Sequence, residues 1–215
     1  MDTYRAVRDF EAALSDYTGA RYAVSTTSCT MALLLAVAYC FTDKRIGTYT
    51  VSIPKRTYCS VPMSVLHAGG LVEFREDSWI GWYRLAPLEV WDSARYFSSG
   101  MYRNDGPVRL EGRPNNCGGM LCVSFHASKT LGDTQGGAIL LDDPEAAAWL
   151  RRARFDGRTE GVEPKEDTFT QIGWHCMMTP DVAARLLLKL STLPLHNAPL
   201  PNSDYPDLST MSIFK

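Results

Sequence analysis

The sequence predicts an α/β fold, a three-layer αβα sandwich in which helices cover both faces of a mostly parallel sheet. Short apolar strands alternate with helical segments along the chain, which is the order that parallel sheets require. The helix predicted at residues 31–41 is apolar on every side, as expected of a helix buried against a sheet. The chain has 215 residues, and we expect one large unit over residues 1–190 and an irregular, proline-rich tail over residues 191–215.

The first half of the chain begins with a helix that has one apolar face. Over residues 4–17 the apolar side chains recur at spacings of three and four, and Gly19 then ends the helix. Pro54 ends a later strand, because proline lacks the N–H group that a sheet needs. The other elements expected here are strands at residues 22–24, 48–53 and 71–74 and helices at residues 31–41 and about 60–68.

The second half contains further strands and helices separated by two long loops. Asp143 and Pro144 predict the start of a helix, because aspartate is favoured as N-cap and proline as the first helical residue. Segment 99–119, rich in Gly, Asn, Pro and Arg, and the charged segment 156–170 are expected to be loops. The remaining elements are strands at residues 88–91, 120–125 and 137–141 and helices at about 144–154 and 180–190.

Charge and hydropathy disfavour membrane insertion and nucleic-acid binding. The 22 basic and 24 acidic residues give a net charge of -2, which provides no general field to attract nucleic acid. Arginines gather at one helix end, at positions 151, 152, 154 and 158, and we interpret them as a solvated helix face. No apolar run approaches the roughly 18 residues of a membrane span, and no signal peptide is recognisable, so we expect a cytoplasmic protein.

The six cysteines indicate reduced thiols rather than a disulfide framework. Only Cys117 and Cys122 lie close together, and no second pair completes a zinc site. We therefore expect no bound metal.

A lysine in the turn between two strands is the first candidate for chemistry. Lys129 lies in the polar stretch 126–136, between the strands predicted at 120–125 and 137–141. Such a turn borders the crevice at the sheet edge where ligands bind in open α/β sheets. On spacing alone, a solvated surface lysine is the more common case.

Three other segments place polar or aromatic side chains beside predicted strands. Ser28-Cys29-Thr30 leads into the buried helix, where free N–H groups favour a phosphate, although an ordinary N-cap has the same pattern. Asp92 closes a strand and is either a partly buried carboxylate that needs a donor or a turn aspartate. Tyr58 is either a flat platform for an aromatic ligand or a core residue.

Four motifs stand in a fixed order over residues 7–157. They are Phe10 to Leu14 with Ala23, Val24 and Ser28 to Leu33; Pro54 to Ser60; Trp91 to Arg95; and Ser124 to Gly137. In order and approximate spacing, the chain resembles the pyridoxal-phosphate-dependent sugar aminotransferases of the DegT/DnrJ/EryC1/StrS family, with a fainter match over residues 173–190. The resemblance implies a fold-type-I transferase large domain that binds pyridoxal 5′-phosphate.

The resemblance also implies roles for the candidate residues. Lys129 would form a Schiff base with the cofactor and then shuttle a proton, which requires a lowered pKa. Asp92 would pair with the pyridine nitrogen, and Tyr58 would stack on the ring. The residues expected to hold the phosphate are Ser28, Cys29, Thr30 and Ser124.

The chain departs from the family pattern at several positions. Arg95 stands in place of a glutamine, and is expected to face the cofactor's edge. His175 and Met177 replace an asparagine and an arginine in a loop that reaches the phosphate of the partner subunit's cofactor in relatives, so His175 is expected at that phosphate. The short connection from Glu73 to Trp91 implies a missing βαβ unit, and the chain ends where the family's C-terminal small domain begins.

Three functional hypotheses follow. The main one is transfer of an amino group from an amino acid to a keto substrate, in a homodimer or larger assembly with shared active sites. The trimmed substrate side and Arg95 leave open a decarboxylation, elimination or rearrangement of an amino-acid-like or modified-nucleotide substrate, as in a viral enzyme. The third is a non-catalytic scaffold subunit, although retention of both Lys129 and Asp92 speaks against it.

Overall fold

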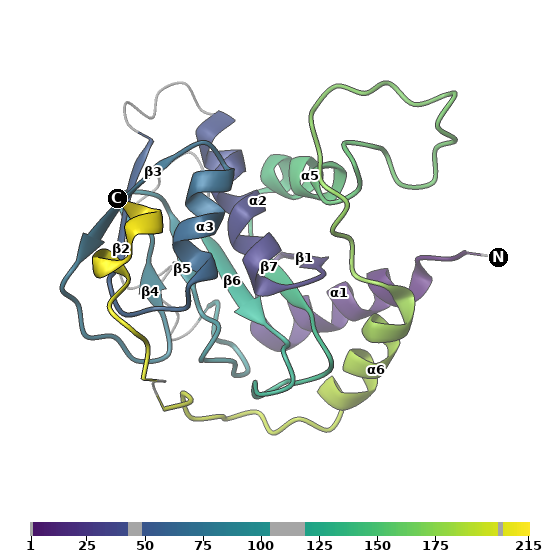
Figure 1. The fold of residues 1–215 in the computed structure, drawn as a ribbon. Coiled ribbons are helices and arrows are strands. Elements are labelled where there is room, and N and C mark those ends of the chain that lie inside the picture. Colours follow the sequence, from purple (N-terminus) through teal and green to yellow (C-terminus); the bar gives the residue numbers. More distant parts are fainter. Residues whose placement is uncertain (1, 43–48, 104–118, 202–203) are drawn as a thin grey trace.

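The chain forms one sheet of five strands and one of two strands (Figure 1). The computed structural model describes residues 2–42, 49–103, 119–201 and 204–215. The strands are β1 (Tyr22–Thr26), β2 (Thr50–Pro54), β3 (Leu71–Arg75), β4 (Tyr83–Arg84), β5 (Val90–Asp92), β6 (Met120–Ser124) and β7 (Gly137–Leu141). The larger sheet has the order β1-β7-β6-β5-β4, and the smaller sheet pairs β2 with β3.

The larger sheet is mixed in direction, which refines the predicted mostly parallel sheet. β5 and β6 are parallel, as are β2 and β3. β7 is antiparallel to β1 and β6, and β4 is antiparallel to β5. β7 reverses because the turn from Phe125 to Gly136 contains no helix, and parallel strands need a longer crossover that is usually helical. β1, β5 and β6 nevertheless share one direction, and the α/β class is confirmed.

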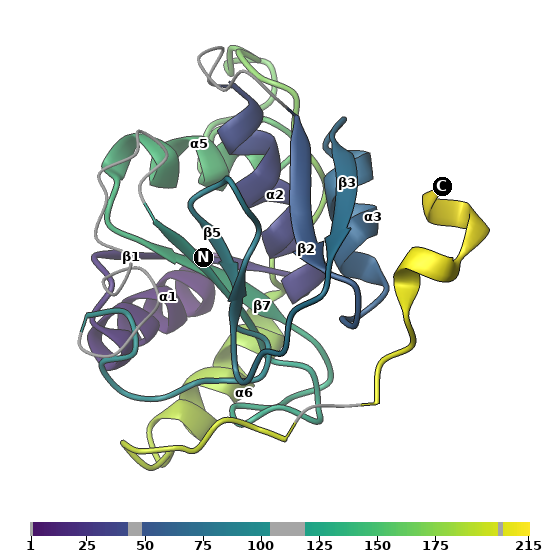
Figure 2. The ribbon, with the colours of Figure 1, turned by 90° about the vertical axis from the view of Figure 1, so that its left-hand side faces the viewer.

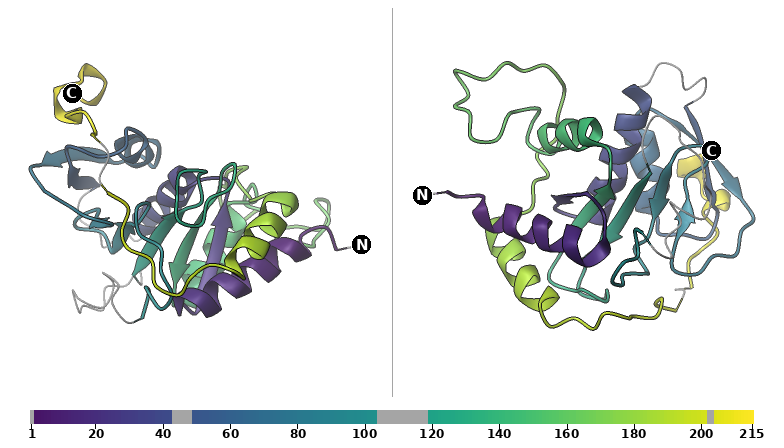
Figure 3. Two further views of the ribbon diagram at one scale, coloured as in Figure 1. Left: turned by 90° about the horizontal axis from the view of Figure 1, so that it is seen from below. Right: turned by 180° about the vertical axis from the view of Figure 1, so that it is seen from behind.

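Helices cover both faces of the larger sheet, which confirms the three layers (Figures 2 and 3). On one face, α1 (Arg5–Thr18) packs against α6 (Pro180–Leu190), and both belong to the same buried apolar cluster. The other face and its separate cluster belong to α2 (Cys29–Thr42), α3 (Ser60–His67) and α5 (Pro144–Ala153).

α2 is apolar all round because other elements enclose it. It contacts β1, β5, β6 and β7 on the sheet and also packs against α3 and α5. Leu35, Ala36 and Val37 are successive residues on different sides of this helix, and all three are fully buried. Burial stabilises the fold by roughly 1.5–3 kcal/mol for each large apolar side chain.

Several predicted boundaries agree with the structure. The bounds of α6 and β7 are those predicted, and Gly19 ends α1 in the left-handed conformation at φ 81°. Asp143 caps α5 as expected, since its carboxylate accepts the N–H of Glu145 at 2.8 Å. The predicted strand start at residue 48 and most of the loop predicted at 99–119 lie outside the described residues.

The tail returns along the molecule and ends against the smaller sheet (Figure 1). Its described part, residues 191–201 and 204–215, contains two short 3-10 helices, η1 (Leu208–Thr210) and η2 (Ser212–Phe214), and no α-helix or strand. Leu208 is fully buried, and its N–H donates to the carbonyl of Lys55 at 2.9 Å. A unit boundary at residue 190 stays a prediction.

Arg154 is buried rather than part of a solvated helix face, which corrects the prediction for that residue. Only 1% of Arg154 and 4% of Glu11 is exposed. The guanidinium of Arg154 donates to the Glu11 carboxylate and, at 2.7 Å, to the carbonyl of Ser25. The same carboxylate accepts the N–H of Ser25 at 2.9 Å, so the pair ties α1, β1 and the end of α5 together.

Arg154→Leu is expected to lower the free energy of unfolding by about 3–5 kcal/mol, because it leaves the Glu11 carboxylate buried without its main partner. Arg152→Leu is the matched control, since Arg152 makes an exposed hydrogen bond to the Thr170 hydroxyl at 3.0 Å. Its loss should change stability by less than about 1 kcal/mol. Urea denaturation measures both, and equal effects would show that the buried pair does not stabilise the fold.

No helix in the described ranges is both long and apolar enough to cross a membrane.

Candidate functional site

A cavity of about 390 Å³ lies where β5 and β6 end and α2 begins. Ligands in open α/β sheets bind at such carboxyl ends, and the volume falls within the range of about 300–1,000 Å³ that small-molecule pockets have. The lining residues are Ser28, Cys29, Thr30, Leu33, Thr57, Tyr58, Ser60, Val61, Trp79, Asp92, Ala94, Arg95, Ser124, His126, Ser128, Lys129, Gln135, Gly136 and Tyr205.

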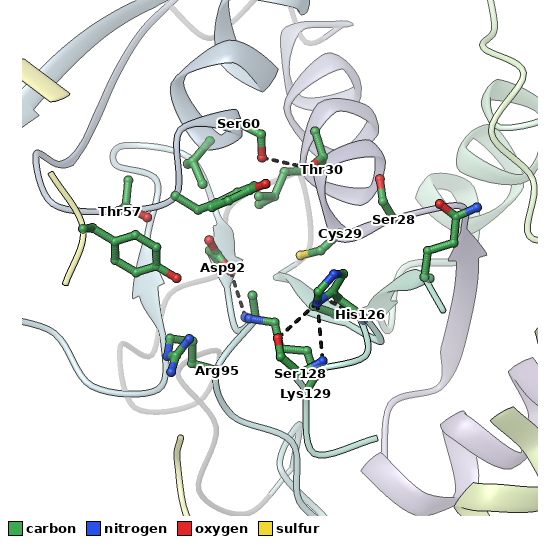
Figure 4. A pocket seen from close by; sticks show the side chains of 18 of the residues that line it. Ser28, Cys29, Thr30, Thr57, Ser60, Asp92, Arg95, His126, Ser128 and Lys129 are labelled. Atoms are coloured by element: carbon green, nitrogen blue, oxygen red, sulfur yellow. Dashed lines mark hydrogen bonds between the residues drawn. The ribbon is translucent and has the colours of Figure 1, made fainter. Parts of the chain in front are cut away.

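Lys129 and Asp92 line this one cavity, as Figure 4 shows. Asp92 is 6% exposed at the end of β5, and Lys129 is half-buried in the turn between β6 and β7. Burial lowers the pKa of Lys129, and the Arg95 guanidinium lowers it further, whereas Asp92 opposes the shift. An amine with a lowered pKa is more often neutral, and only the neutral amine can attack an aldehyde or accept a proton.

The carboxylate of Asp92 is held by two donors. Its Oδ2 accepts the hydroxyl of Tyr83 at 2.7 Å, and its Oδ1 accepts the N–H of Ala94 at 2.8 Å. Thr57 contacts the same Tyr83 hydroxyl at 2.5 Å. Burial raises the pKa of Asp92, and the two hydrogen bonds oppose this shift. Asp92 is thus a buried acid aimed into the cavity, and a turn aspartate is excluded.

Tyr83→Phe is expected to raise the pKa of Asp92 further, because the ionised carboxylate loses a hydrogen-bond donor. The free energy of unfolding at neutral pH should fall by about 1.5–3 kcal/mol, the usual contribution of a hydrogen bond to a charged group. Carboxyl NMR titration and urea denaturation measure the two effects.

Tyr102→Phe is the matched control for Tyr83→Phe, since its hydroxyl donates to the carbonyl of Gly119 at 2.8 Å and not to Asp92. It should leave the titration of Asp92 unchanged. If Asp92 titrates in Tyr83→Phe as it does in the wild type, the Tyr83 hydroxyl does not stabilise the ionised Asp92 carboxylate.

Hydroxyl groups gather near the starts of α2 and α3 (Figure 4). Ser28 caps α2, where its hydroxyl accepts the N–H of Met31 at 3.2 Å. The hydroxyls of Thr30 and Ser60 lie 2.8 Å apart, and Ser124 lines the same cavity at the end of β6. Hydroxyls beside the first N–H groups of two helices suit a bound anion such as a phosphate.

Gly137 brings the start of α2 close to β7. A Cβ atom at this position would lie 2.4 Å from the backbone nitrogen of Cys29 and 2.5 Å from the carbonyl carbon of Ser28. Only glycine therefore permits the approach that places Ser28 and Cys29 at the cavity.

Cys29 lines the cavity as a buried thiol. Burial raises its pKa well above the usual value, and Asp92 and Cys122 add to the shift, so the thiol stays protonated and acts as an apolar wall. Cys59, Cys122 and Cys176 are also free thiols, while Cys117 lies outside the described residues. Within the described ranges, no three His, Cys, Asp or Glu side chains converge as metal ligands do.

The turn that carries Lys129 is fixed to α6 through Asp133. The Asp133 carboxylate pairs with Arg185 at 2.8 Å and with Lys189 at 2.9 Å, and Lys189 also donates to the carbonyl of Gly132 at 2.6 Å. The hydrogen bond from Lys189 lowers the pKa of Asp133, and Arg185 adds to this. Lys129 therefore extends from a turn that is anchored at its far side.

Arg95 and Tyr58 both line the cavity. Tyr58 is 57% exposed, which excludes the core alternative. Arg95 donates a hydrogen bond to the carbonyl of Pro201, and it contributes to the lowered pKa of Lys129.

His175 lies outside this cavity. Its ring is 2.8 Å from the Asp156 carboxylate, and its side chain is 88% exposed. The structure therefore does not bring His175 to the other candidate residues of the same chain, and a contact with a partner subunit's cofactor stays a prediction.

Several cavity or adjacent residues were not predicted from the sequence. Ser60 and His126 lie within two of the four motifs. Their polar side chains, close in sequence to Tyr58 and Ser124, could have indicated that they line the cavity. Tyr83 and Tyr205 gave no signal, because they reach the site only through β4 and the returning tail.

The chain is similar to solved structures of aminotransferases. A sugar aminotransferase from Micromonospora echinospora superposes with a TM-score of 0.68 at 18% identity, over 88% of this chain and 61% of that chain. PseC of Helicobacter pylori, an aminotransferase of pseudoaminic acid biosynthesis, gives 0.67 at 18% identity, over 88% and 58%. A DegT DnrJ EryC1 StrS aminotransferase from Brucella abortus gives 0.64 at 22% identity, over 88% and 59%.

These likenesses show the fold, and the chain spans about 60% of the length of such neighbours. No curated protein sequence matches it significantly. The sequence model of one family matches residues 1–77 and 109–199, which include Lys129 and the hydroxyl groups of the cavity. The chain thus belongs to the DegT/DnrJ/EryC1/StrS aminotransferase family.

Proposed function

We propose that this protein is a pyridoxal-phosphate-dependent enzyme that transfers an amino group from an amino acid to a keto substrate through a Schiff base on Lys129. One observation supports this above all: an amine of lowered pKa and a buried carboxylate face one cavity whose other end is lined by hydroxyls. The three groups match the aldehyde, the ring nitrogen and the phosphate of that cofactor.

The chemistry of the residues at the cavity also fits the cofactor. Among the described residues, the donors to the buried Asp92 carboxylate are the Tyr83 hydroxyl and the Ala94 N–H, which are both neutral, so a protonated ring nitrogen would complete its pairing. Ser28, Thr30 and Ser60 would bind the phosphate, and the exposed face of Tyr58 is available for the ring.

Each of these residues would do one task in the reaction. The cofactor would supply an electron sink for the substrate carbon. Lys129 would attach the cofactor, and its neutral amine would carry a proton to and from that carbon. Asp92 would keep the ring nitrogen charged, and the hydroxyls would fix the cofactor's position while Lys129 is detached.

A spectrum of the protein supplied with pyridoxal 5′-phosphate tests the proposal. We expect a yellow protein that loses its colour when mixed with an amino donor such as glutamate, while 2-oxoglutarate appears. A protein that stays colourless with excess cofactor would contradict the proposal and favour the scaffold hypothesis.

A changed reaction with the same cofactor is the second candidate. Arg95 faces the cavity beside Lys129, so an anionic substrate group could bind there. The same mixing experiment separates the candidates, since carbon dioxide or ammonia is released in a decarboxylation or elimination and the cofactor keeps its colour.

We also propose that the protein acts as a homodimer with shared sites. His175 is exposed outside its own cavity, and Ile172 and Phe169 in the same segment are 83% and 61% exposed. Sedimentation of the cofactor-loaded protein tests this, and a monomer that binds the cofactor tightly would contradict it.

A further inference from the structure

We propose that the chain's own tail, residues 204–215, forms a fixed wall of the Lys129 cavity, and that Tyr205 is the tail residue that contacts the substrate. Tyr205 lines the cavity together with Lys129, although 76 positions separate them in the sequence. The assignment of a substrate contact depends on the function proposed above, whereas the assignment of a wall does not.

The tail is anchored on the smaller sheet at several points. Asp207 pairs with Lys55 at 2.9 Å, and the N–H of Leu208 donates to the carbonyl of Lys55 at 2.9 Å. The Leu208 side chain is fully buried, and the Phe214 ring packs edge-on against Phe74 with centroids 5.8 Å apart. The ion pair, the backbone hydrogen bond and the two apolar contacts together fix the position of the tail.

The ion pair at the anchor persists over a wide pH range. Hydrogen bonds from Ser209 and then Lys55 lower the pKa of Asp207 to about 2. The hydrogen bonds that Lys55 donates to the carboxylates of Glu76 and Asp207 raise the pKa of Lys55. Both groups therefore stay charged at neutral and mildly acidic pH.

The tail enters this anchor along the cavity rim. The N–H of Leu200 donates to the carbonyl of Arg95 at 2.8 Å, and Arg95 donates back to the carbonyl of Pro201. Arg56 contacts the carbonyl of Tyr205 at 3.4 Å. Arg95, which lines the cavity, and Arg56 thus bind the tail backbone on either side of residues 202–203, which lie outside the described ranges.

Tyr205 completes a cluster of aromatic rings at the cavity. Its ring is nearly parallel to that of Trp79, with centroids 6.2 Å apart and planes at 19°, and it meets Tyr58 edge-on at 6.5 Å. All three residues line the cavity. Such rings pack well against a flat or apolar group, so Tyr205 would limit the size and shape of the substrate part that enters.

Acylation of lysines with acetic anhydride, followed by peptide mapping, tests the wall without cofactor or substrate. In Tyr205→Ala, the rate at Lys129 relative to Lys165, an exposed lysine of the loop near residue 160, should rise at least about threefold, because solvent gains access to the cavity. Tyr205→Phe keeps the ring and should match the wild type. Asp207→Asn, which weakens the anchor, should raise the rate in the same direction.

Equal Lys129 rates in the wild type, Tyr205→Ala and Asp207→Asn would overturn the wall. The substrate contact is tested on the cofactor-loaded protein with a series of amino acids from alanine to tryptophan. Tyr205→Ala should change KM in a way that depends on side-chain size, with kcat little altered, and an unchanged KM series would overturn the contact. If no amino acid reacts with the wild type, the proposed function fails while the acylation result still decides the wall.

Discussion

Lys129→Ala is expected to abolish turnover, with kcat at least about 10⁴-fold below the wild type, because the variant loses both the attachment point and the proton-transfer group. Cofactor binding should weaken but persist. The hydroxyls of Ser28, Thr30 and Ser60 lie on elements that this substitution does not touch, and Asp92 keeps its hydrogen bonds to Tyr83 and Ala94.

Borohydride reduction of the loaded protein measures the attachment directly. In the wild type, the mass of the reduced cofactor should appear on the peptide that contains Lys129. In Lys129→Ala no lysine should carry it, and phosphate-anchored cofactor should leave on dialysis. Lys165→Ala, in the exposed loop, is the matched control and should retain both label and turnover. A label on Lys55, or turnover by Lys129→Ala, would contradict the assignment.

The lowered pKa of Lys129 predicts how the reactivity of its amine depends on pH. Burial and Arg95 both disfavour the charged amine, so Lys129 becomes neutral at a lower pH than an ordinary solvated lysine does. The rate of acylation at Lys129 in the cofactor-free protein should therefore reach its plateau at a lower pH. Arg95→Leu removes one cause of the shift and should move the plateau toward higher pH.

The order of elements was predictable because its signals are local. α6 was set by a proline at its start and an apolar stripe, and the helix of residues 29–42 by a continuous apolar run. Strand pairing was less predictable, since it depends on which strands meet in space. The turn around Lys129 is too short for a crossover helix, so β7 returns antiparallel, and the alternation of elements alone does not report this.

The candidate site was predictable where motifs sit at strand ends. Lys129, Asp92, Ser28 and Thr30 follow or end strands whose carboxyl ends meet at one sheet edge, so the fold brings them together. The site's outer side was not predictable in this way. Tyr205 reaches the cavity because a tail without periodic pattern is held by contacts such as one buried leucine, one ion pair and one pair of aromatic rings, and none of these contacts has a signature in the sequence.

Asp92→Asn is expected to lower turnover by about 10²–10³-fold, the usual loss when a positioned electrostatic partner of the reacting group is removed. An amide cannot hold a proton on the ring nitrogen as a carboxylate does, while the N–H of Ala94 can still donate to the amide oxygen. Ser93→Ala is a matched control on the adjacent residue, since its hydroxyl donates to the carbonyl of Tyr96 rather than into the cavity.

The same substitution should stabilise the cofactor-free protein at neutral pH. Burial raises the pKa of Asp92 above its ordinary value of 3.8, so between these two pKa values the folded state binds more protons than the unfolded state. Stability therefore falls as pH rises through that interval and stays lower above it. Asparagine does not titrate, so the advantage of the variant should be absent below the ordinary pKa and complete above the raised one.

Urea denaturation at acidic and neutral pH, with and without cofactor, measures this difference. Without cofactor, Asp92→Asn should be the more stable protein at neutral pH. With cofactor, the order should reverse, because a protonated ring nitrogen pairs with the buried carboxylate of the wild type and stabilises the folded state by mass action. A buried carboxylate that destabilises the cofactor-free protein and stabilises the cofactor-bound protein has its partner in the cofactor. If the wild type is the more stable protein in both states, Asp92 is a structural residue and the ring nitrogen binds elsewhere.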